Sequence, residues 1–435
     1  MMDASEPSLL LRLVRALTMD VSPLRASREY RLLYAGQFVS SFGSAISYVV
    51  LPVQMYQLTR SSFAVGMLGV AEFVPMFVLA FVGGALADYI DRRRLIVLSE
   101  AGMALCCGVL VANALLPQPR VGVLFAVAAL FAAFNALHRP AMEALTPRIL
   151  PPEMMPAVGA LQGFRYSFNF ILGPAIAGMI VGTMGAAFAY ALDGATFLFS
   201  LGCVLLIRAV PPPEDADRPS LQAIRDAWRY ARRRQELLGT YLIDLIAMFF
   251  GMPMALFPAI AESFGNTQVG WFYSMMAVGP LLISLTSGWT NRVQRHGLAV
   301  ILSVIVWGLA IVGFGWTRNL WLALFFLALA GAADNVSGLF RMTIWNQTIP
   351  DHLRGRMAGI ELISYTTGPY LGNAEAGLVA AAFSLRTSVV SGGVLCVVGA
   401  CALALLLPRF LRYDGRDGIA QKEAEEAARL APGNQ

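Results

Sequence analysis

Charged side chains inside long apolar stretches are the residues of this 435-residue chain that could do chemistry. A charge at the centre of a membrane helix costs about 2.5–3.5 kcal/mol even on a lenient insertion scale, so it needs a partner or a task. In chain order these residues are Glu72, Arg165, Asp193, Asp244, Asp334, Arg341, Glu361 and Glu375. A carboxylate in such a place can bind and release a proton, and a nearby arginine favours its ionised form. The pattern therefore indicates proton transfer or ion pairing.

Glu72 and Arg165 are the leading candidates for proton coupling, because both fall near the middle of their apolar runs. We expect Arg165 to approach Glu72 in one conformation and to leave it in another, switching the carboxylate between its ionised and protonated forms. A static buried pair is the alternative, since the loss of one partner would also be damaging. Asp244 and Asp334 are the reserve candidates, whereas Asp193 is expected to accept structural hydrogen bonds.

The elements that carry these charges must be membrane helices. Hydrophobic residues make up 57% of the chain and charged residues 14%, with a mean hydropathy of +0.63, whereas about a quarter of the residues in soluble domains are charged. About twelve runs reach the roughly 20 apolar residues that cross a bilayer. They leave no room for a separate soluble domain. The composition predicts an all-α membrane protein with about twelve transmembrane helices.

Several classes of function are excluded or disfavoured by single residue types. Lys422 is the only lysine, so the chain cannot contain a G-x-x-x-x-G-K-[ST] phosphate loop for ATP. The five cysteines fall inside predicted helices and are expected to be small core residues rather than disulfides. The three histidines are scattered, so we expect no metal site and no cofactor. The net charge of +5 comes from arginines in short loops, which argues against nucleic acid as a partner.

A stripe of polar side chains runs along the first predicted helix, residues 32–58. Its members are Gln37, Ser40, Ser41, Ser44 and Tyr48. They recur at intervals of three or four residues, so they lie on one face of a helix. In lipid such a face must meet protein or water, and we expect it to line a substrate cavity. Helix packing through small hydroxyl residues is the alternative.

Further candidates for the cavity are Asn135, Asn169 and Met248 on later helices. An aromatic and methionine-rich lining would suit a bulky amphipathic ligand. The residues that suggest it are Phe131, Phe134, Met248, Phe249, Met252 and Met254. Side chains that simply face lipid are the alternative.

The stretch GGALADYIDRRR, residues 83–94, follows the second apolar run and holds two carboxylates and three guanidiniums. Glycines that permit close helix packing, followed by a basic cluster, describe a helix leaving the bilayer on its cytoplasmic side. We predict a gate that joins the cytoplasmic ends of the two halves. Its residues are Gly84, Asp88, Asp91, Arg92, Arg93, Arg354 and Arg356. A solvated loop with weak exposed ion pairs is the alternative.

The second half of the chain repeats the first. Val65-Gly66 matches Val269-Gly270, Gly84 matches Gly288, Gly159 matches Gly359, and Gly173-Pro174 matches Gly368-Pro369. The offset stays between about 195 and 204 residues, which indicates two six-helix units related by an axis along the membrane normal. The expected organisation is therefore a pseudo-symmetric 6+6 bundle.

The boundaries of this organisation follow from composition and charge. We expect a cytoplasmic N-terminal segment (1–30), a six-helix bundle (31–210), a cytoplasmic linker with an amphipathic helix (211–236), a second bundle (237–412) and a cytoplasmic tail (413–435) that is mobile and solvated. Arginines concentrate in the loops that this scheme places inside the cell, as the positive-inside rule requires. The chain is thus expected to work as a monomer in the plasma membrane, with both termini cytoplasmic.

The motifs resemble those of the major facilitator superfamily. Residues 83–94 are similar to its loop pattern G-x-L-A-D-R-x-G-R-R, with Tyr89 in place of a basic residue and Asp91 in place of a glycine. GPAIAG (173–178) resembles its exporter motif G-P-x-x-G-G, except that Ala177 replaces a glycine. VQMYQLT (53–59) and residues 341–359 resemble the branch that holds the enterobactin exporter and the macrolide efflux proteins.

The resemblance implies a central cavity lined by helices 1, 4, 7 and 10 and flanked by helices 2, 5, 8 and 11. It would put Asp244 and Asp334 at the cavity, and Glu72 and Arg165 at the interface of the halves. The implied function is secondary active transport by alternating access, with protons driving export of a small amphipathic molecule such as a siderophore or drug. A facilitator or importer is one alternative. A membrane enzyme acting on lipid is another, but it would need converging catalytic groups that the sequence does not display.

Overall fold

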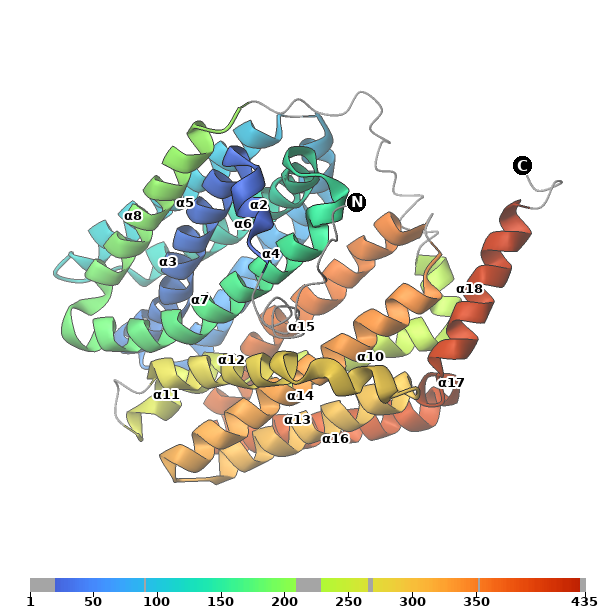
Figure 1. Ribbon diagram of the computed structural model, residues 1–435. Coiled ribbons are helices and arrows are strands. Elements are labelled where there is room, and N and C mark those ends of the chain that lie inside the picture. The colour runs from blue at the N-terminus through green and yellow to red at the C-terminus, as the bar shows by residue number, and fades with distance from the viewer. Residues whose placement is uncertain (1–19, 90, 209–227, 265–268, 351–352, 431–435) are drawn as a thin grey trace, which may run out of the picture.

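The computed structural model describes residues 20–89, 91–208, 228–264, 269–350 and 353–430, and these form helices joined by short loops (Figure 1). Ten helical stretches among them are long and apolar enough to cross a membrane. A shorter apolar helix (Val269–Leu285) and the 29-residue helix Arg354–Ala382 add to these ten. The prediction of an all-α membrane protein with about twelve membrane helices is confirmed.

The N-terminal half extends from α2 to α8. Its helices are α2 (Ser22–Ala26), α3 (Arg28–Thr59), α4 (Ser62–Tyr89), α5 (Arg92–Ala114), α6 (Val121–Ile149), the short 3₁₀ helix η1 (Pro152–Met154), α7 (Met155–Thr183) and α8 (Gly185–Leu205). Local capping fixes where several of them begin. The Ser27 side chain accepts a hydrogen bond from the Tyr30 N–H at the start of α3, which satisfies a backbone donor that has no partner within the helix.

The C-terminal half extends from α10 to α16 and is followed by two further helices, α17 and α18. Its helices are α10 (Gln235–Phe250), η2 (Met254–Leu256), α11 (Phe257–Glu262), α12 (Val269–Leu285), η4 (Ser287–Arg292), α13 (His296–Trp316), α14 (Leu320–Thr348), α15 (Arg354–Ala382), α16 (Leu385–Leu406), α17 (Pro408–Leu411) and α18 (Gly415–Leu430). Most of the linker expected to hold an amphipathic helix, residues 209–227, lies outside the described residues.

The helices of the two halves pack in the same order. In the first half α3 contacts α7 and α8, while α5 contacts α6 and α8; in the second half α10 contacts α15 and α16, while α13 contacts α14 and α16. The pairs α4–α6 and α12–α14 also correspond. The predicted repeat of six helices is therefore confirmed, and the halves meet chiefly where α4 packs on α15 and α7 packs on α12.

Glycines create both of these contacts between the halves. A Cβ atom on Gly66 of α4 would overlap the backbone oxygen of Asn373 on α15, and one on Gly270 of α12 would overlap the backbone oxygen of Pro174 on α7. Small residues let helix backbones approach closely in a membrane. The two glycines that the sequence repeat pairs thus occupy equivalent positions in the structure.

A second pair of matched glycines, one in each half, makes contacts within the halves. A Cβ atom on Gly173 of α7 would overlap the Ala45 side chain on α3, and one on Gly368 of α15 would overlap the Met248 side chain on α10. The repeated Gly-Pro dipeptides therefore mark the same helix contact in each half.

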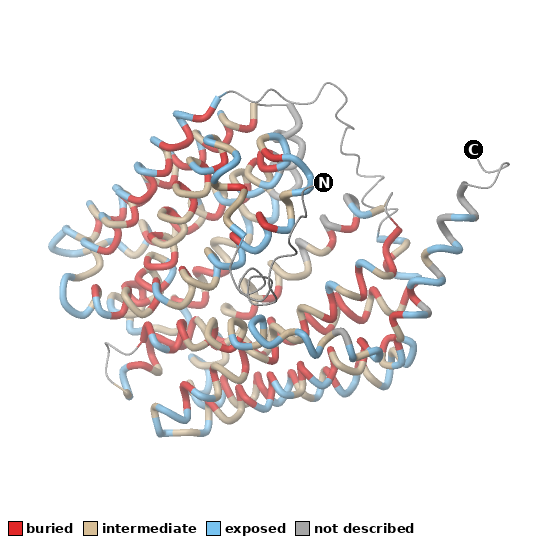
Figure 2. The backbone as a smooth tube through the Cα atoms, in the orientation of Figure 1, coloured by how far each residue is buried: buried red, intermediate tan, exposed pale blue. Residues whose placement is uncertain are grey.

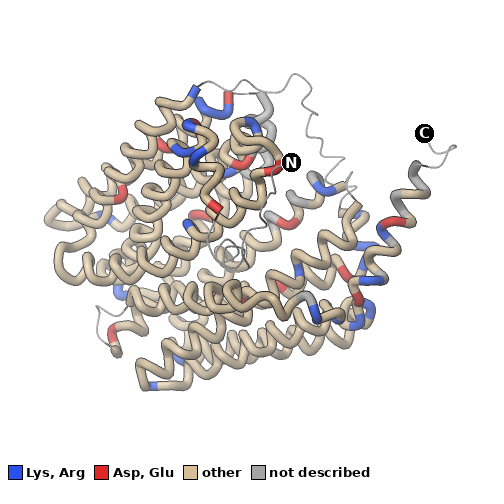
Figure 3. Tube along the Cα trace, in the orientation of Figure 1, with Lys and Arg blue, Asp and Glu red and all other residues tan. Residues whose placement is uncertain are grey.

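The two ends of the bundle differ in their connections. At one end, called the turn end, short turns join α3 to α4, α7 to α8, α13 to α14 and α15 to α16. The other end, called the linker end, is where α3 and α10 begin and where α8 and α16 end, and the halves diverge toward it (Figure 1). Buried residues follow the helix contacts inside each half, with exposed residues on the periphery (Figure 2). Basic residues gather toward the linker end (Figure 3).

The seventh membrane stretch is interrupted, which the sequence interpretation did not foresee. Helix α10 ends at Phe250, and α11 continues only after the 3₁₀ helix η2. At the break, a Cβ atom on Gly251 would overlap the Trp307 indole nitrogen, and Pro253 lacks the N–H that would continue a helix. The corresponding α3 runs unbroken through Pro52.

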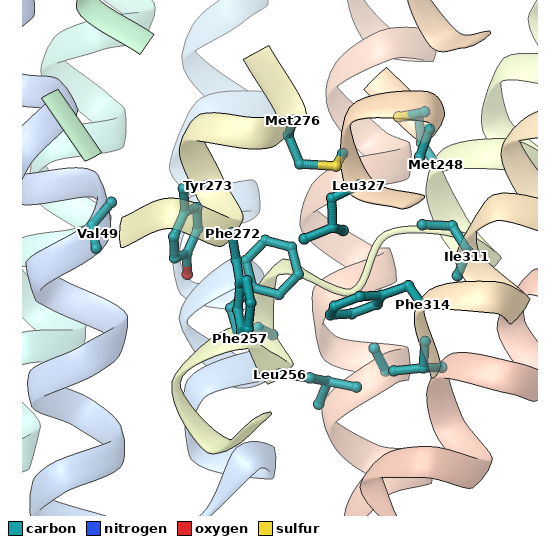
Figure 4. Close-up of a cluster of buried hydrophobic side chains, with 14 of the residues drawn as sticks. Val49, Met248, Leu256, Phe257, Phe272, Tyr273, Met276, Ile311, Phe314 and Leu327 are labelled. Atoms are coloured by element: carbon teal, nitrogen blue, oxygen red, sulfur yellow. The ribbon is translucent and has the colours of Figure 1, made fainter. Parts of the chain in front are cut away.

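Aromatic packing holds α11 in place beyond this break. The Phe257 ring meets Phe272 of α12 at 5.7 Å and Phe314 of α13 at 5.9 Å, in edge-to-face geometry. Phe272 and Phe314 are themselves 5.8 Å apart, so three rings from three helices form one cluster (Figure 4). Such ring pairs add about 0.5–1.5 kcal/mol each beyond the area they bury.

Residues 415–430 of the tail form helix α18, which the sequence interpretation did not foresee. The Gly415 N–H donates a hydrogen bond to the Gln294 carbonyl at 3.4 Å. Just before it, Tyr413 is 8% exposed, and its hydroxyl lies 3.1 Å from the Thr348 hydroxyl. The tail is thus attached to the end of α14, which α18 contacts.

Candidate functional site

Three charged side chains cluster in the C-terminal half, on α10 and α14. The Arg341 guanidinium forms an ion pair with Asp244 and lies 3.9 Å from the Asp334 carboxylate. Asp334 and Arg341 are two turns apart on α14 and so share one face of it. The side chains of Arg341 and Asp244 are 10% and 4% exposed, whereas that of Asp334 is 40% exposed. One buried guanidinium is therefore shared by one buried and one accessible carboxylate.

The accessible carboxylate faces the other half of the molecule. The Tyr166 hydroxyl on α7 lies within electrostatic range of both Asp334 and Arg139 of α6. The Arg139 guanidinium in turn lies 5.5 Å from the ring centre of Tyr365 on α15, across the interface, and it pairs with Glu143 at 3.0 Å. Charged side chains of α6 and α14 and tyrosines of α7 and α15 thus border the space between the halves at this depth.

Glu72 lies in a small pocket of about 70 Å³ between the halves. That volume is about two water molecules in the liquid. From the first half Tyr48 also lines the pocket, and from the second half Met254, Tyr273 and Asn373 line it. Among the described residues Glu72 forms no ion pair. It is therefore a carboxylate at the interface whose polar neighbours are hydroxyl and amide groups.

The structure does not bring Glu72 and Arg165 together. Arg165 donates a hydrogen bond to the Gln37 amide oxygen at 3.4 Å, and its charge lies near the phenol groups of Tyr30 and Tyr34. Within the described residues no carboxylate contacts it directly. In this conformation the two expected partners thus have separate surroundings.

A carboxylate that sequence reasoning missed, Glu100 of α5, lies beside Gln37. Its side chain is fully buried, and its Oε1 atom accepts hydrogen bonds from the Gln37 amide at 2.8 Å and from the Ser200 hydroxyl at 2.7 Å. His138 of α6 lies 3.4 Å from the same oxygen. Glu100 is the sixth residue of the predicted membrane stretch that begins at Leu95. A search for charged residues inside the apolar stretches, which found Glu72, would therefore also have found Glu100.

The expected cavity residues divide into two groups. Gln37, Asn169 and Met248 are 7%, 1% and 7% exposed and pack against neighbouring helices. The Asn169 amide donates to the Ser41 hydroxyl at 2.5 Å, which joins α7 to α3. Three others are more accessible: Ser44 is partly exposed, and Asn135 and Tyr48 are exposed. The polar stripe of the first helix therefore serves mainly contacts with other helices, and only its Tyr48 end lies at the interface.

Asp193 of α8 is hydrogen-bonded by neutral groups. The Ser47 hydroxyl donates to its carboxylate at 2.5 Å, the Thr196 hydroxyl lies at 3.4 Å and the Cys107 thiol at 3.5 Å. These donors come from α3, α8 and α5. Asp193 thus joins three helices in the structural role that was expected for it.

The described part of the charged stretch stabilises its own half. The Asp91 carboxylate accepts a hydrogen bond from the Arg93 N–H at 2.9 Å and caps α5. The Arg93 guanidinium donates to the carbonyls of Val204 and Leu205 at the end of α8, where a cation is favourable. Arg92 is buried. Arg354 is exposed at the start of α15, and the surroundings of Gly84, Asp88 and Arg356 are not described.

Polar contacts also join the halves at the turn end. Arg60 forms an ion pair with Glu262 at the end of α11. The Tyr56 hydroxyl donates to the same carboxylate at 3.3 Å. Arg60 ends α3 in a left-handed conformation, with φ of 53°, which turns the chain sharply toward α4. One carboxylate of the second half is thus held by two side chains of the first.

Comparison with known proteins gives consistent results. A model of the transmembrane secretion effector family matches residues 18–428. Enterobactin exporter EntS of Escherichia coli O81 (strain ED1a) is 29% identical over 402 residues, covering 89% of this chain and 94% of the exporter, and the protein of the same name from strain SE11 matches equally.

Solved structures of transporters share the fold. A variant of nucleoside transporter NupG superposes with a TM-score of 0.74 at 13% identity, covering 87% of this chain and all of the other. A POT family transporter in complex with 5-aminolevulinic acid gives a TM-score of 0.69 at 12% identity, covering 88% of this chain and 97% of the other. At these identities the likeness concerns the fold alone.

Proposed function

The chain belongs to the transmembrane secretion effector family of the major facilitator superfamily, and on that premise we propose that it exports a small amphipathic molecule in exchange for protons. The observation that carries the proposal is the charge cluster of Asp244, Arg341 and Asp334. Two carboxylates and one guanidinium leave one negative charge, which a single proton neutralises. The accessible carboxylate is the one that can exchange that proton with the space between the halves.

Coupling follows from competition for Arg341. When Asp334 is ionised it shares the guanidinium with Asp244, and when it is protonated the guanidinium belongs to Asp244 alone. Each state favours a different placement of α14 relative to α10, so proton binding biases the equilibrium between conformations. Glu72 remains a second candidate for the proton site, because it too lies between the halves.

The direction of transport rests on the charge distribution and the closed turn end. Basic residues concentrate at the linker end (Figure 3), so the positive-inside rule makes that end cytoplasmic. The Arg60–Glu262 ion pair and the glycine contacts then close the outer side. In this proposal the structure is the cytoplasm-facing conformation of an alternating-access cycle in the plasma membrane, and a monomer suffices for it.

Aromatic side chains support a substrate with flat apolar parts. The ring of Phe170 lies 4.5 Å from that of Tyr166 and 6.2 Å from that of Tyr48, which in turn lies 5.8 Å from Tyr273 across the interface. Tyr166 and Tyr48 are 60% and 43% exposed. This row offers stacking surfaces with hydroxyl groups at its edge. The matched relatives are named for the export of enterobactin, which makes enterobactin the first compound to test.

Reconstituted vesicles with an imposed pH gradient test the proposal. The wild-type protein should concentrate enterobactin against its gradient and carry protons the opposite way, as read by a pH-sensitive dye in the lumen. Asp334→Asn mimics the protonated form and should reduce accumulation at least about tenfold, which corresponds to 1.4 kcal/mol, while exchange of enterobactin without a gradient continues. Asp193→Asn is the matched control, because it removes a buried carboxylate away from the interface.

Three results would count against the proposal. Accumulation by Asp334→Asn at the wild-type rate would exclude this carboxylate as the proton site, and the same test on Glu72→Gln would then decide for or against the second candidate. Equilibration of enterobactin without dependence on the pH gradient would indicate a facilitator. Accumulation inside vesicles whose linker end faces inward would indicate an importer.

A further inference from the structure

Five helices of the N-terminal half bring together a polar cluster that the proposed mechanism does not use. Glu100 of α5 is its centre, with Gln37 of α3, His138 of α6 and Ser200 of α8 around one carboxylate oxygen. Arg165 of α7 joins the cluster through the Gln37 amide. Every membrane helix of this half except α4 therefore contributes a side chain.

Glu100 is fully buried, as is Ser200 beside it. Its Oε1 atom accepts two hydrogen bonds at 2.7 and 2.8 Å, but its Oε2 atom is buried and lacks a hydrogen-bond partner among the described residues. An ionised carboxylate buried in this way costs several kcal/mol unless a charge compensates it. Glu100 therefore needs either a bound proton or a nearby positive charge.

Two side chains of the cluster can supply that proton or charge. His138 is the titratable group in contact with Glu100, with 3.4 Å between its Nε2 atom and the carboxylate. Arg165 is the second, and the Gln37 amide lies between it and Glu100: the amide oxygen accepts from Arg165, and the amide nitrogen donates to Glu100. The amide dipole is thus aligned with the field of the two charges.

The remaining neighbours of Glu100 carry no charge at neutral pH. Ser200 and Gln37 are neutral donors, and the Cys203 thiol of α8 lies within electrostatic range. Tyr30 and Tyr34 of α3 lie on the far side, near Arg165. The charge balance of the cluster is therefore set by Glu100, His138 and Arg165.

We propose that Glu100 and His138 form a proton-binding site in the N-terminal half, entered through His138 and sensed by Arg165 through the Gln37 amide. The proposal rests on the proton-coupled function above and adds a second titratable site to it. It also gives Arg165 a carboxylate partner other than Glu72.

Access to the site runs along α6. His138 is 12% exposed, and its neighbour Arg139 is 54% exposed and lies over Tyr365 across the interface. A proton arriving from the space between the halves binds the imidazole first. In the next step the N–H bond of the imidazolium breaks and an O–H bond forms on Glu100, which leaves a neutral imidazole and a neutral carboxylic acid.

The proton on Glu100 changes the position of Arg165. While Glu100 is ionised, the aligned Gln37 amide holds the Arg165 guanidinium toward it. Once Glu100 is neutral, the electrostatic part of this attraction disappears, and Arg165 is free to follow α7. Because α7 packs on α12 of the other half, a movement of α7 that follows protonation of Glu100 changes the contact between the halves.

Infrared difference spectroscopy on the full chain in lipid vesicles tests the site without a substrate. Spectra are recorded between about pH 6 and pH 9, where exposed carboxylates, which titrate near pH 4, stay ionised. The wild type should gain a carboxylic acid C=O band as the pH falls. Glu100→Gln should lose one component of this band, and Asp193→Asn, the matched buried carboxylate, should keep that component.

Two milder variants protect the test against misfolding of Glu100→Gln. Ser200→Ala removes one hydrogen bond to the carboxylate and should shift the frequency of the same component, because the C=O stretch depends on its hydrogen bonds. His138→Gln should change the pH range in which the component appears. A structural role for the cluster would alter neither quantity.

The outcomes separate this proposal from the proposed function. A spectrum with no acid band, or a band that is identical in wild type, Glu100→Gln and Ser200→Ala, would overturn the proton site, even if the vesicles show proton-driven transport. An acid band assigned to Glu100 would support the site, even if enterobactin proves not to be the substrate.

Discussion

Asparagine substitutions in the Asp244–Arg341–Asp334 cluster should affect stability in a strongly non-additive way. Removal of one partner from a buried ion pair costs about 3–5 kcal/mol, because the other charge stays buried and unpaired. In Asp244→Asn, however, Arg341 still has Asp334 at 3.9 Å. Two unit charges 4 Å apart attract each other by about 4 kcal/mol at an effective dielectric constant of about 20. Because Asp334 is 40% exposed, solvent screens roughly half of this attraction.

The free energy of unfolding should therefore fall by about 2 kcal/mol in Asp244→Asn and by less than about 1 kcal/mol in Asp334→Asn, whose charge is screened. The double variant leaves Arg341 buried without a carboxylate and should lose about 4 kcal/mol, more than the sum. Adding Arg341→Gln to the double variant removes the stranded charge and should recover most of the loss.

Unfolding of the purified variants in mixed detergent micelles with increasing SDS measures these differences. The order expected for stability is wild type, Asp334→Asn, Asp244→Asn and then the double variant, with the triple variant close to the single ones. Additive losses in the double variant would refute the idea that the carboxylates share one guanidinium. A triple variant less stable than the double one would refute the stranded charge as the cause.

Three further substitutions test the contacts between the halves. Arg60→Glu alone should separate the turn ends in distances between spin labels, and the charge swap Arg60→Glu/Glu262→Arg should restore them; equal distances in both would argue against the ion pair as a latch. Gly66→Val should abolish transport by forcing α4 away from α15, whereas Gly108→Val, which enters open space, should leave transport within about twofold of wild type; similar losses in both would exclude the close contact as the cause. Asp88→Asn should abolish transport with normal membrane insertion, and unchanged transport would remove the proposed cytoplasmic gate.

The helices and their repeat were predictable because both depend on local sequence. Apolar runs specify the membrane helices, and the matched glycines indicated the repeat, whereas the contacts that these glycines make are seen only in the structure. Gly66 and Gly270 act through their missing side chain, because a Cβ atom at either position would overlap the backbone of the other half. The helical tail could also have been predicted, since residues 423–430 are rich in alanine and glutamate, which favour helices.

The partners of the charged residues were not predictable, for a geometric reason. Counting residues gives the depth of a side chain along its helix, at about 1.5 Å per residue, but it does not give the rotation of the helix about its axis. Glu72 and Arg165 also differ in depth: Glu72 lies beside Tyr48 and Arg165 beside Gln37, and these two neighbours are about 16 Å apart along α3. The cluster around Glu100 requires the packing of five helices and so appears only in three dimensions.

The break in the seventh stretch likewise depends on tertiary contacts. Gly251 and Pro253 are breaking signals, but Pro52, Pro75 and Pro280 lie inside continuous helices. What distinguishes the break is the Trp307 indole, which occupies the space beside Gly251. The sequence contains no mark of that neighbour.

The interruption between α10 and α11 gives the two halves different mechanics. On one side of the contact between Arg60 and Glu262, α3 is a continuous helix of 32 residues. On the other side, α11 is a helix of only six residues, about 9 Å long, and the break after Phe250 separates it from α10. A displacement of Glu262 therefore acts on the break between α10 and α11 and on the Phe257 contacts that tie α11 to α12 and α13. The contact at Glu262 thus joins a continuous helix of one half to an interrupted helical stretch of the other.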